Sequence, residues 1–131
     1  MKIMIASDVH GSSFYAEKIK STFEKEGAEL LVLLGDIYNP GPRNPIEKVK
    51  EYAPLKVAET FNSVKDRLMV IKGNCDSQVD TLISEFYFAE EGVILEGGKR
   101  ITLTHGHIFN KDNMPPACGD ALIYGHVHTG C

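Results

Sequence analysis

The sequence predicts an α/β protein in which buried strands alternate with amphipathic helices. Two observations support this class: the main apolar runs are too short for helices, and the segments between them carry helical periodicity. The chain has 131 residues, of which 43% are hydrophobic and 24% charged, which is the composition of a globular protein large enough to bury a core. We therefore expect a single domain over residues 1–131.

Five apolar runs, each ending in Gly or a polar cluster, are predicted to be buried strands. They are Lys2–Ala6, Leu30–Leu34, Leu68–Lys72, Arg100–Thr104 and Ala121–Tyr124.

Two segments between these strands are predicted to be helices. Phe14–Gly27 places Tyr15, Ile19 and Phe23 on one face and ends in glycine, which commonly caps helices. Pro54–Asp66 repeats the pattern, and proline suits its first position because the missing N–H has no intrahelical partner there. The order strand, helix, strand, helix, strand predicts parallel neighbours.

The remaining segments differ in character. Residues 92–104 read GVILEGGKRITLT, in which Gly97-Gly98 predicts a tight hairpin turn between two strands, so a mixed sheet is expected. Asn39–Tyr52 begins too rich in Pro and Gly for regular structure, and we expect a surface loop followed by a short helix.

A polar motif follows every predicted strand except the first arm of the hairpin. The motifs are Asp8-Val9-His10-Gly11, Gly35-Asp36, Gly73-Asn74-Cys75-Asp76, His105-Gly106-His107 and Gly125-His126-Val127-His128. Each of the first three alone is compatible with an ordinary turn, but all five histidines of the chain fall within these motifs. Because ligands bind at the carboxyl ends of strands in α/β sheets, the five motifs are expected to converge.

Aspartate, histidine and asparagine side chains form a ligand set that suits Zn, Mn, Fe or Ni. In an Asp-x-His or His-x-His step on extended backbone, both side chains point to the same side and can chelate together. The candidate ligands are Asp8, His10, Asp36, Asn74, His105, His126 and His128, with His107 in reserve. That number exceeds the needs of one ion and fits two metals about 3.5–4 Å apart with a bridging carboxylate, an arrangement typical of displacement at phosphorus.

The ordered motifs DVHG, GD, GNCD, HGH and GHVH resemble those of the calcineurin-like metallophosphoesterases over essentially the whole chain. GNCDS, GPRN and THGHIF look like the bacterial YfcE-type phosphodiesterase branch. The resemblance implies a four-layer α/β/β/α sandwich with mixed sheets and hydrolysis of a phosphoester by a hydroxide between two metals.

The resemblance also implies a role for each candidate ligand. Asp8, His10 and His128 would hold one metal, whereas Asn74, His105 and His126 would hold the other. Asp36 would bridge them. Mn²⁺ is the expected ion, with Zn²⁺, Fe²⁺ and Ni²⁺ as alternatives.

Two departures from the family pattern affect the expectations. Many members carry a histidine after the asparagine of the third motif, on the leaving-group side, where this chain has Cys75. A thiol donates hydrogen bonds weakly, so His107 and Arg43, the latter a candidate phosphate contact, are possible substitutes. The second departure is that the sequence stops at Cys131, so we expect the C-terminal strands of the family to be missing and the second sheet to be shortened.

Composition and motif spacing disfavour other classes of function. The formal net charge of −4 comes from mixed charges, with no basic stripe for bulk nucleic-acid binding. Neither a signal peptide nor a membrane span is predicted, so we expect a cytoplasmic protein with a small phosphoester substrate, and a homo-oligomer is compatible with the sequence. Three cysteines without CxxC spacing are expected to be free thiols, and Cys75 is disfavoured as a nucleophile because carboxylates are its expected neighbours.

Two other functions compete with that of a phosphodiesterase. The first is a binding or scaffold module with a vestigial metal site, since a eukaryotic retromer subunit resembles this branch. It is disfavoured because no candidate ligand is missing. The second, a His-x-His amidohydrolase or a zinc deaminase, fails because a (β/α)₈ barrel takes about 250 residues and the deaminase signature is absent.

Overall fold

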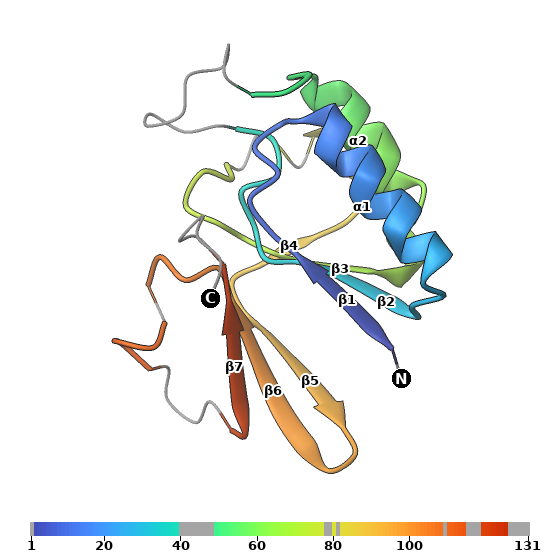
Figure 1. Cartoon of the computed structure of the whole chain (residues 1–131). Coiled ribbons are helices and arrows are strands. Elements are labelled where there is room, and N and C mark those ends of the chain that lie inside the picture. The colour runs from blue at the N-terminus through green and yellow to red at the C-terminus, as the bar shows by residue number, and fades with distance from the viewer. Residues whose placement is uncertain are drawn as a thin grey trace.

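The computed structural model describes residues 2–39, 49–77, 80, 82–108, 110–114 and 119–125. Figure 1 shows two β-sheets, with helices α1 (Ser13–Lys25) and α2 (Pro54–Asn62) lying side by side on one of them. The second sheet lies against the opposite face of the first. The described residues therefore form one helical layer and two sheet layers of an α/β sandwich.

The first sheet is parallel throughout. Its strands β1 (Ile3–Ala6), β2 (Leu30–Leu33), β3 (Leu68–Ile71) and β4 (Phe88–Ala89) follow one another in the order β1-β2-β3-β4. The parallel arrangement of the first three strands confirms the prediction. β4 was missed because two residues are too short to carry a periodicity.

The second sheet is mixed, as predicted. Strands β5 (Gly92–Glu96) and β6 (Lys99–Thr104) form an antiparallel hairpin, and β7 (Ala121–Tyr124) pairs with β6 in parallel. Gly97 and Gly98 turn the hairpin with φ of 56° and 77°, values that glycine adopts without steric cost.

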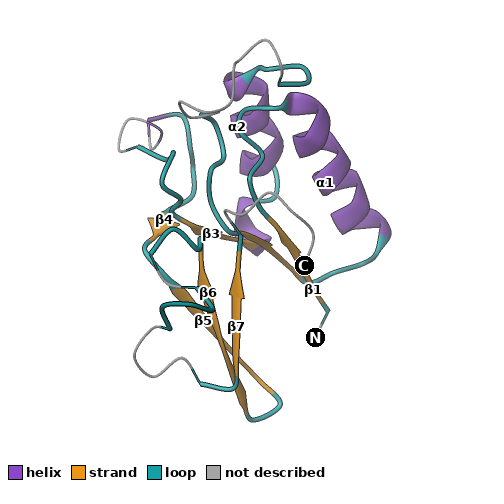
Figure 2. Ribbon diagram, turned by 60° about the vertical axis from the view of Figure 1, so that its left-hand side comes forward, coloured by secondary structure: helices purple, strands orange, loops and turns teal. Residues whose placement is uncertain are grey.

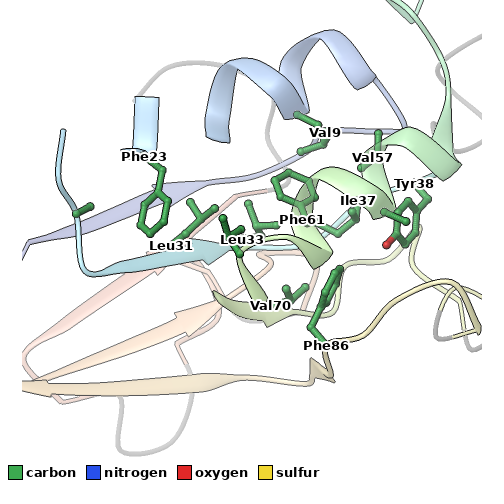
Figure 3. Close-up of a cluster of buried hydrophobic side chains, with 14 residues drawn as sticks. Val9, Phe23, Leu31, Leu33, Ile37, Tyr38, Val57, Phe61, Val70 and Phe86 are labelled. Atoms are coloured by element: carbon green, nitrogen blue, oxygen red, sulfur yellow. The ribbon is translucent and has the colours of Figure 1, made fainter. Parts of the chain in front are cut away.

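The period-two alternation of β2 divides the core into two layers. Leu31 and Leu33 are fully buried on the helix side, where they pack with Phe23 and Phe61, as Figure 3 shows. Val32 belongs to the other cluster, which includes residues of β5 and β6 and joins the two sheets. A continuous apolar run at β2 is thus required because both of its faces are covered.

Helix α1 begins one residue before the predicted start, whereas α2 begins at the predicted Pro54 but ends early. Ser12 caps α1, its hydroxyl accepting a hydrogen bond from the Tyr15 N–H at 3.3 Å, and Gly27 follows the helix with φ 65°. The prediction that the second helix reaches Asp66 is wrong, because α2 ends at Asn62 and a 3₁₀ turn, η2 (Lys65–Arg67), follows. At this point the Ser63 hydroxyl donates to the Thr60 carbonyl, a local bond that competes with helix continuation.

The predicted loop after β2 is only partly described. Residues 40–48, which include Arg43 and most of the predicted short helix, lie outside the described residues. Tyr52, at the far end of the loop, forms a β-bridge with Ser12 and so joins the loop to the start of α1. Within the described ranges, no helix combines the length and apolar character that crossing a membrane requires.

Candidate metal centre

The loops that follow β1 and β2 run together at the carboxyl end of the first sheet. The Asp8 N–H donates to the Gly35 carbonyl at 3.0 Å, and the His10 N–H donates to the Asp36 carbonyl at 2.8 Å. Figure 2 shows that β6 and β7 also end next to this sheet. The strand ends of both sheets therefore meet at one place, as the order of the motifs predicts.

Asp36 lies at the centre of the cluster and is 1% exposed. Its Oδ2 is 3.1 Å from Nε2 of His105 and 3.7 Å from Nε2 of His10. Its Oδ1 accepts a hydrogen bond of 2.8 Å from the backbone N–H of Cys75. The side chain is thus held from the third motif while its second oxygen faces two imidazoles.

Backbone carbonyls orient both of these histidines. Nδ1 of His10 is 2.8 Å from the Asn39 carbonyl, and Nδ1 of His105 is 2.6 Å from the Leu34 carbonyl. A carbonyl can only accept, so each Nδ1 carries the proton and each Nε2 presents its lone pair to the centre when the ring is neutral. This arrangement is typical of histidines that ligate metals through Nε2.

Two further candidates complete the described part of the cluster. Asp8 Oδ1 is 3.5 Å from Nε2 of His10, and Asp8 Oδ2 accepts a hydrogen bond from the Ser7 hydroxyl at 2.6 Å. Asn74 is exposed, and its Oδ1 is 2.9 Å from Nε2 of His105. Five of the seven predicted ligands are therefore brought together, and the other two, His126 and His128, lie outside the described residues.

The backbone of the cluster is in a strained conformation. Asp8, His10 and Asp36 have φ of 59°, 50° and 56°, in the left-handed region that residues with a Cβ rarely adopt. Glu51 is the one other non-glycine residue with positive φ in the described part of the chain. Strain concentrated in this way is characteristic of functional sites, because the surrounding structure must hold it in place.

Two glycines allow the loops to approach one another. A Cβ on Gly35 would lie 2.5 Å from the Gly73 nitrogen and 2.8 Å from Nδ1 of His105. A Cβ on Gly73 would overlap Oδ1 of Asp36 and lie 2.6 Å from the Asp36 nitrogen. The glycines of the second and third motifs are thus needed because any side chain there would displace Asp36 or His105.

Asp76 is a residue whose role the sequence did not reveal. It is 6% exposed, and its carboxylate accepts hydrogen bonds from the backbone N–H groups of Asp36 (2.8 Å), Ile37 (2.8 Å) and Gly73 (2.7 Å). One side chain therefore fixes the two loops that carry Asp36 and Asn74. The signal was present in the GNCD motif, but a motif does not say which backbone groups a carboxylate will accept from.

Asn39 was also missed. Besides orienting His10 through its carbonyl, it donates through Nδ2 to the Cys75 carbonyl at 3.1 Å and to Asp80 Oδ2 at 3.2 Å. It thus links the second motif to the third. No pattern in the sequence marks it, because it acts through its backbone as much as through its side chain.

Two of the candidates for leaving-group assistance, His107 and Cys75, lie next to the buried ligands. His107 is exposed, its ring centroid is 5.4 Å from that of His105, and partial burial together with His105 lowers its pKa. The Cys75 thiol is half-buried, and burial with the nearby Asp36 and Asp76 charges raises its pKa to about 11. A thiol that stays protonated at neutral pH supports the prediction that Cys75 is not a nucleophile.

The described side chains fit a divalent metal centre. Potential ligand atoms form two groups, and within each group all the atoms lie within 4.8 Å of one another. The first group comes from Asp8, Asp36 and His105, and the second from His10, Asp36 and Cys75. Asp36 belongs to both groups, as a bridging carboxylate would. Neutral imidazole nitrogen and carboxylate oxygen suit Mn, Fe, Ni or Zn, whereas a protonated thiol is a poor ligand.

Without metal, the acidic neighbours act on the two histidines. Burial alone would lower the pKa of His105, but its hydrogen bond with Asp36 and the Asp36 charge raise the pKa overall. For His10, burial is likewise outweighed by Asp8, the Asn39 carbonyl and Asp36, and the pKa is raised. Protons and metal ions therefore compete for the same Nε2 atoms.

This competition predicts that stability depends on pH differently with and without metal. In the metal-free protein, each histidine whose pKa is raised by folding stabilises the folded state. This stabilisation is complete below the pKa of an unfolded histidine, about 6.5, and it is lost as the pH rises through the raised pKa of the folded protein. We expect the Tm in EDTA to fall from pH 6 to pH 8, and the stabilisation by Mn²⁺ to grow over the same interval. Thermal unfolding at both pH values checks this; parallel pH profiles with and without Mn²⁺ would contradict it.

Comparisons with known proteins identify the family of the chain. Residues 1–130 match the calcineurin-like phosphoesterase superfamily domain. Phosphodiesterase YfcE of Escherichia coli (strain K12) is 44% identical over 131 residues, covering 98% of this chain and 70% of the relative. Probable metallophosphoesterase YsnB of Bacillus subtilis (strain 168) is 26% identical over 136 residues, covering 98% of this chain and 64% of the relative.

A solved structure gives the same result for the fold. The structure of Yfce, a phosphoesterase from E. coli, matches with a TM-score of 0.83 and 42% identity, over 88% of this chain and 63% of that chain. The chain or its matched part thus spans between 63% and 70% of the length of these relatives. On the strength of both the sequence and the fold, the chain belongs to the calcineurin-like phosphoesterase superfamily.

Proposed function

We propose that the protein is a dinuclear metal-dependent phosphodiesterase that hydrolyses a small phosphoester. The observation that carries the proposal is the position of Asp36, buried between the Nε2 atoms of His10 and His105. A relative named phosphodiesterase, 44% identical over 98% of this chain, supports an enzyme rather than the scaffold alternative.

We assign the ligands as the family resemblance implies. Asp8, His10 and His128 would hold one ion and Asn74, His105 and His126 the other, with Asp36 shared. The shared position is supported by the presence of Asp36 in both described groups of ligand atoms. Mn²⁺ is the ion we propose first, with Zn²⁺, Fe²⁺ and Ni²⁺ as alternatives of the same ligand preference.

Two bound cations would supply a water of lowered pKa and would neutralise charge on the phosphoryl oxygens. The residues of the chain hold this arrangement in place. Asp36, fixed by the Cys75 N–H, keeps the two histidines at a set spacing. Cys75 lies on the leaving-group side, where a protonated thiol donates weakly, so His107 and Arg43 are the proposed sources of assistance. We expect slow turnover unless the leaving group is already good.

We further propose that residues 1–131 act as one domain on a small substrate in the cytoplasm, without bulk nucleic-acid or membrane binding. A homo-oligomer is compatible with this proposal. Elemental analysis of the purified protein by mass spectrometry tests its first premise, since about two divalent ions per chain are expected. A metal-free protein that cannot be reloaded would favour the scaffold alternative.

The catalytic proposal is tested with bis(4-nitrophenyl) phosphate. We expect Mn²⁺ to stimulate the cleavage of this diester and EDTA to abolish the stimulation. His105→Ala should lower kcat/KM at least about 100-fold, because the variant lacks both the proposed metal ligand Nε2 and the contact of Nδ1 with the Leu34 carbonyl. Leu103→Ala is the matched control: Leu103 is equally buried and lies on β6, the strand that leads to His105, so its loss should cost stability but leave the activity of folded protein nearly unchanged. Retained activity in His105→Ala would contradict the proposal.

A further inference from the structure

A small cavity lies beside the metal centre. Its volume is about 240 Å³, and its described walls come from the end of β6 and from the connection between β4 and β5. The lining residues are Glu90, Glu91, Thr104, His105, Gly106, His107 and Ile108. Because His105 is a wall of the cavity and also contacts Asp36, a group in the cavity would be adjacent to the centre.

The cavity suits a small apolar group. Pockets for drug-sized ligands have volumes of about 300–1,000 Å³, so 240 Å³ accommodates one ring or a short chain. Ile108 is 54% exposed and contributes a large aliphatic side chain to the wall of the cavity. Gly106 adds no side chain, and the rings of His105 and His107 are tilted by 53° to one another.

The charges at the cavity disfavour a second anionic group. Glu90 and Glu91 both line it, and the described lining contains no lysine or arginine. Lys72 is 4.0 Å from Glu90, an exposed pair that offsets one of the two carboxylates at most. The remaining negative charge would repel an additional phosphate or carboxylate on the substrate.

We propose that this cavity holds one uncharged ester group of the phosphodiester, an aryl or short alkyl substituent, and that Glu90 and Glu91 select against substrates with a charged group there. The inference rests on the proposed function, since it places the phosphorus of the substrate at the metal centre. In this arrangement, Ile108 makes apolar contact with the ester group, and the two glutamates make the cavity prefer an uncharged group.

The kinetic test compares two symmetric diesters, bis(4-nitrophenyl) phosphate and bis(4-carboxyphenyl) phosphate, on the Mn²⁺-loaded chain. Because both ester groups of each diester are identical, the test does not depend on which of them enters the cavity. Dividing kcat/KM of the variant by that of the wild type for each diester cancels the different intrinsic reactivities of the two diesters. Glu90→Gln/Glu91→Gln should raise kcat/KM for the carboxylated diester about two- to fivefold relative to the uncharged one. Ile108→Ala should raise KM for the uncharged diester about three- to tenfold.

The matched control is Glu24→Gln/Glu29→Gln, which removes two exposed carboxylates that do not line the cavity and should leave the preference unchanged. If the control shifts the preference equally, net charge rather than the cavity is responsible and the inference is overturned. Added salt should weaken the preference of the wild type, because screening acts on exposed charges.

The same diesters also serve as ligands, which separates this inference from the proposed function. If the loaded protein hydrolyses neither diester, calorimetry compares their affinities in the same variants. A Kd ratio that responds to Glu90→Gln/Glu91→Gln but not to the control would support the cavity assignment although the proposed function had failed. An unchanged ratio, or no binding of either diester, would overturn it.

Discussion

Asp36→Asn is expected to lower kcat/KM for an aryl phosphodiester by at least about 10³-fold, a loss of roughly 4 kcal/mol in transition-state stabilisation. The substitution preserves the shape of the side chain and removes its charge. The amide oxygen can still accept the hydrogen bond of the Cys75 N–H, which the carboxylate accepts at 2.8 Å. The amide nitrogen, however, would face Nε2 of His105, now 3.1 Å from the carboxylate, and cannot ligate a cation.

The loss should appear in metal binding as well as in catalysis. Because Asp36 belongs to both described groups of ligand atoms, the variant should bind fewer than two ions per chain. Elemental analysis, circular dichroism and kinetics on one preparation measure occupancy, fold and activity together. Asp66→Asn, which removes an exposed carboxylate, should leave all three near wild-type values. Two ions per chain with full activity in Asp36→Asn would show that Asp36 is not the bridging ligand.

The sequence predicted most of the elements and the convergence of the first four motifs because both depend on local patterns. Apolar runs marked the buried strands, and the rule that ligands gather at the carboxyl ends of strands brought Asp8, Asp36 and Asn74 to one place. His105 was expected there as well, although its strand belongs to the other sheet. The Gly97-Gly98 hairpin was equally local, since the turn requires positive φ at both positions.

What the sequence did not predict depends on contacts between distant segments. At the end of α2, Asn62 donates a hydrogen bond through Nδ2 to the Ile83 carbonyl and accepts one through Oδ1 from the Glu85 N–H, both about twenty residues away. The orientation of His10 depends on a carbonyl of Asn39, twenty-nine residues away. The cavity beside His105 is lined by Glu90 and Glu91, which carry no motif. No periodicity or spacing in the sequence predicts any of these contacts.

The second large effect is expected at Asp76. Among the described candidate ligands, its side chain hydrogen-bonds only to the backbone N–H of Asp36. Asp76→Asn keeps the size of the side chain but replaces one acceptor oxygen with a donor. The three N–H groups of Asp36, Ile37 and Gly73 then share a single oxygen, and one or more is left buried without an acceptor. Each such group costs about 1–3 kcal/mol, so a matching loss in the free energy of unfolding is expected.

The functional consequence should exceed the loss of stability, because Asp76 fixes the two loops that carry the candidate ligands Asp36 and Asn74. Residues that orient metal ligands typically change metal affinity or activity by 10–100-fold, and we expect a loss in that range for Mn²⁺ binding by folded Asp76→Asn. The measurement is Mn²⁺ titration at a temperature where circular dichroism shows the variant fully folded. Saturating Mn²⁺ should restore much of kcat, since the substitution moves the ligands without removing any of them.

The control for Asp76 is a variant of similar instability that leaves the loops intact. Val57 is a fully buried residue of α2 in the core that the helices share with the first sheet, and Val57→Ala should cost a few kcal/mol at most through the cavity it creates. If Asp76 only stabilises the fold, both variants will bind Mn²⁺ with wild-type affinity once folded. If it positions the ligands, only Asp76→Asn will bind weakly. The comparison therefore distinguishes a carboxylate that stabilises the fold from one that builds the metal centre, because excess metal can compensate for displaced ligands but not for an unfolded chain.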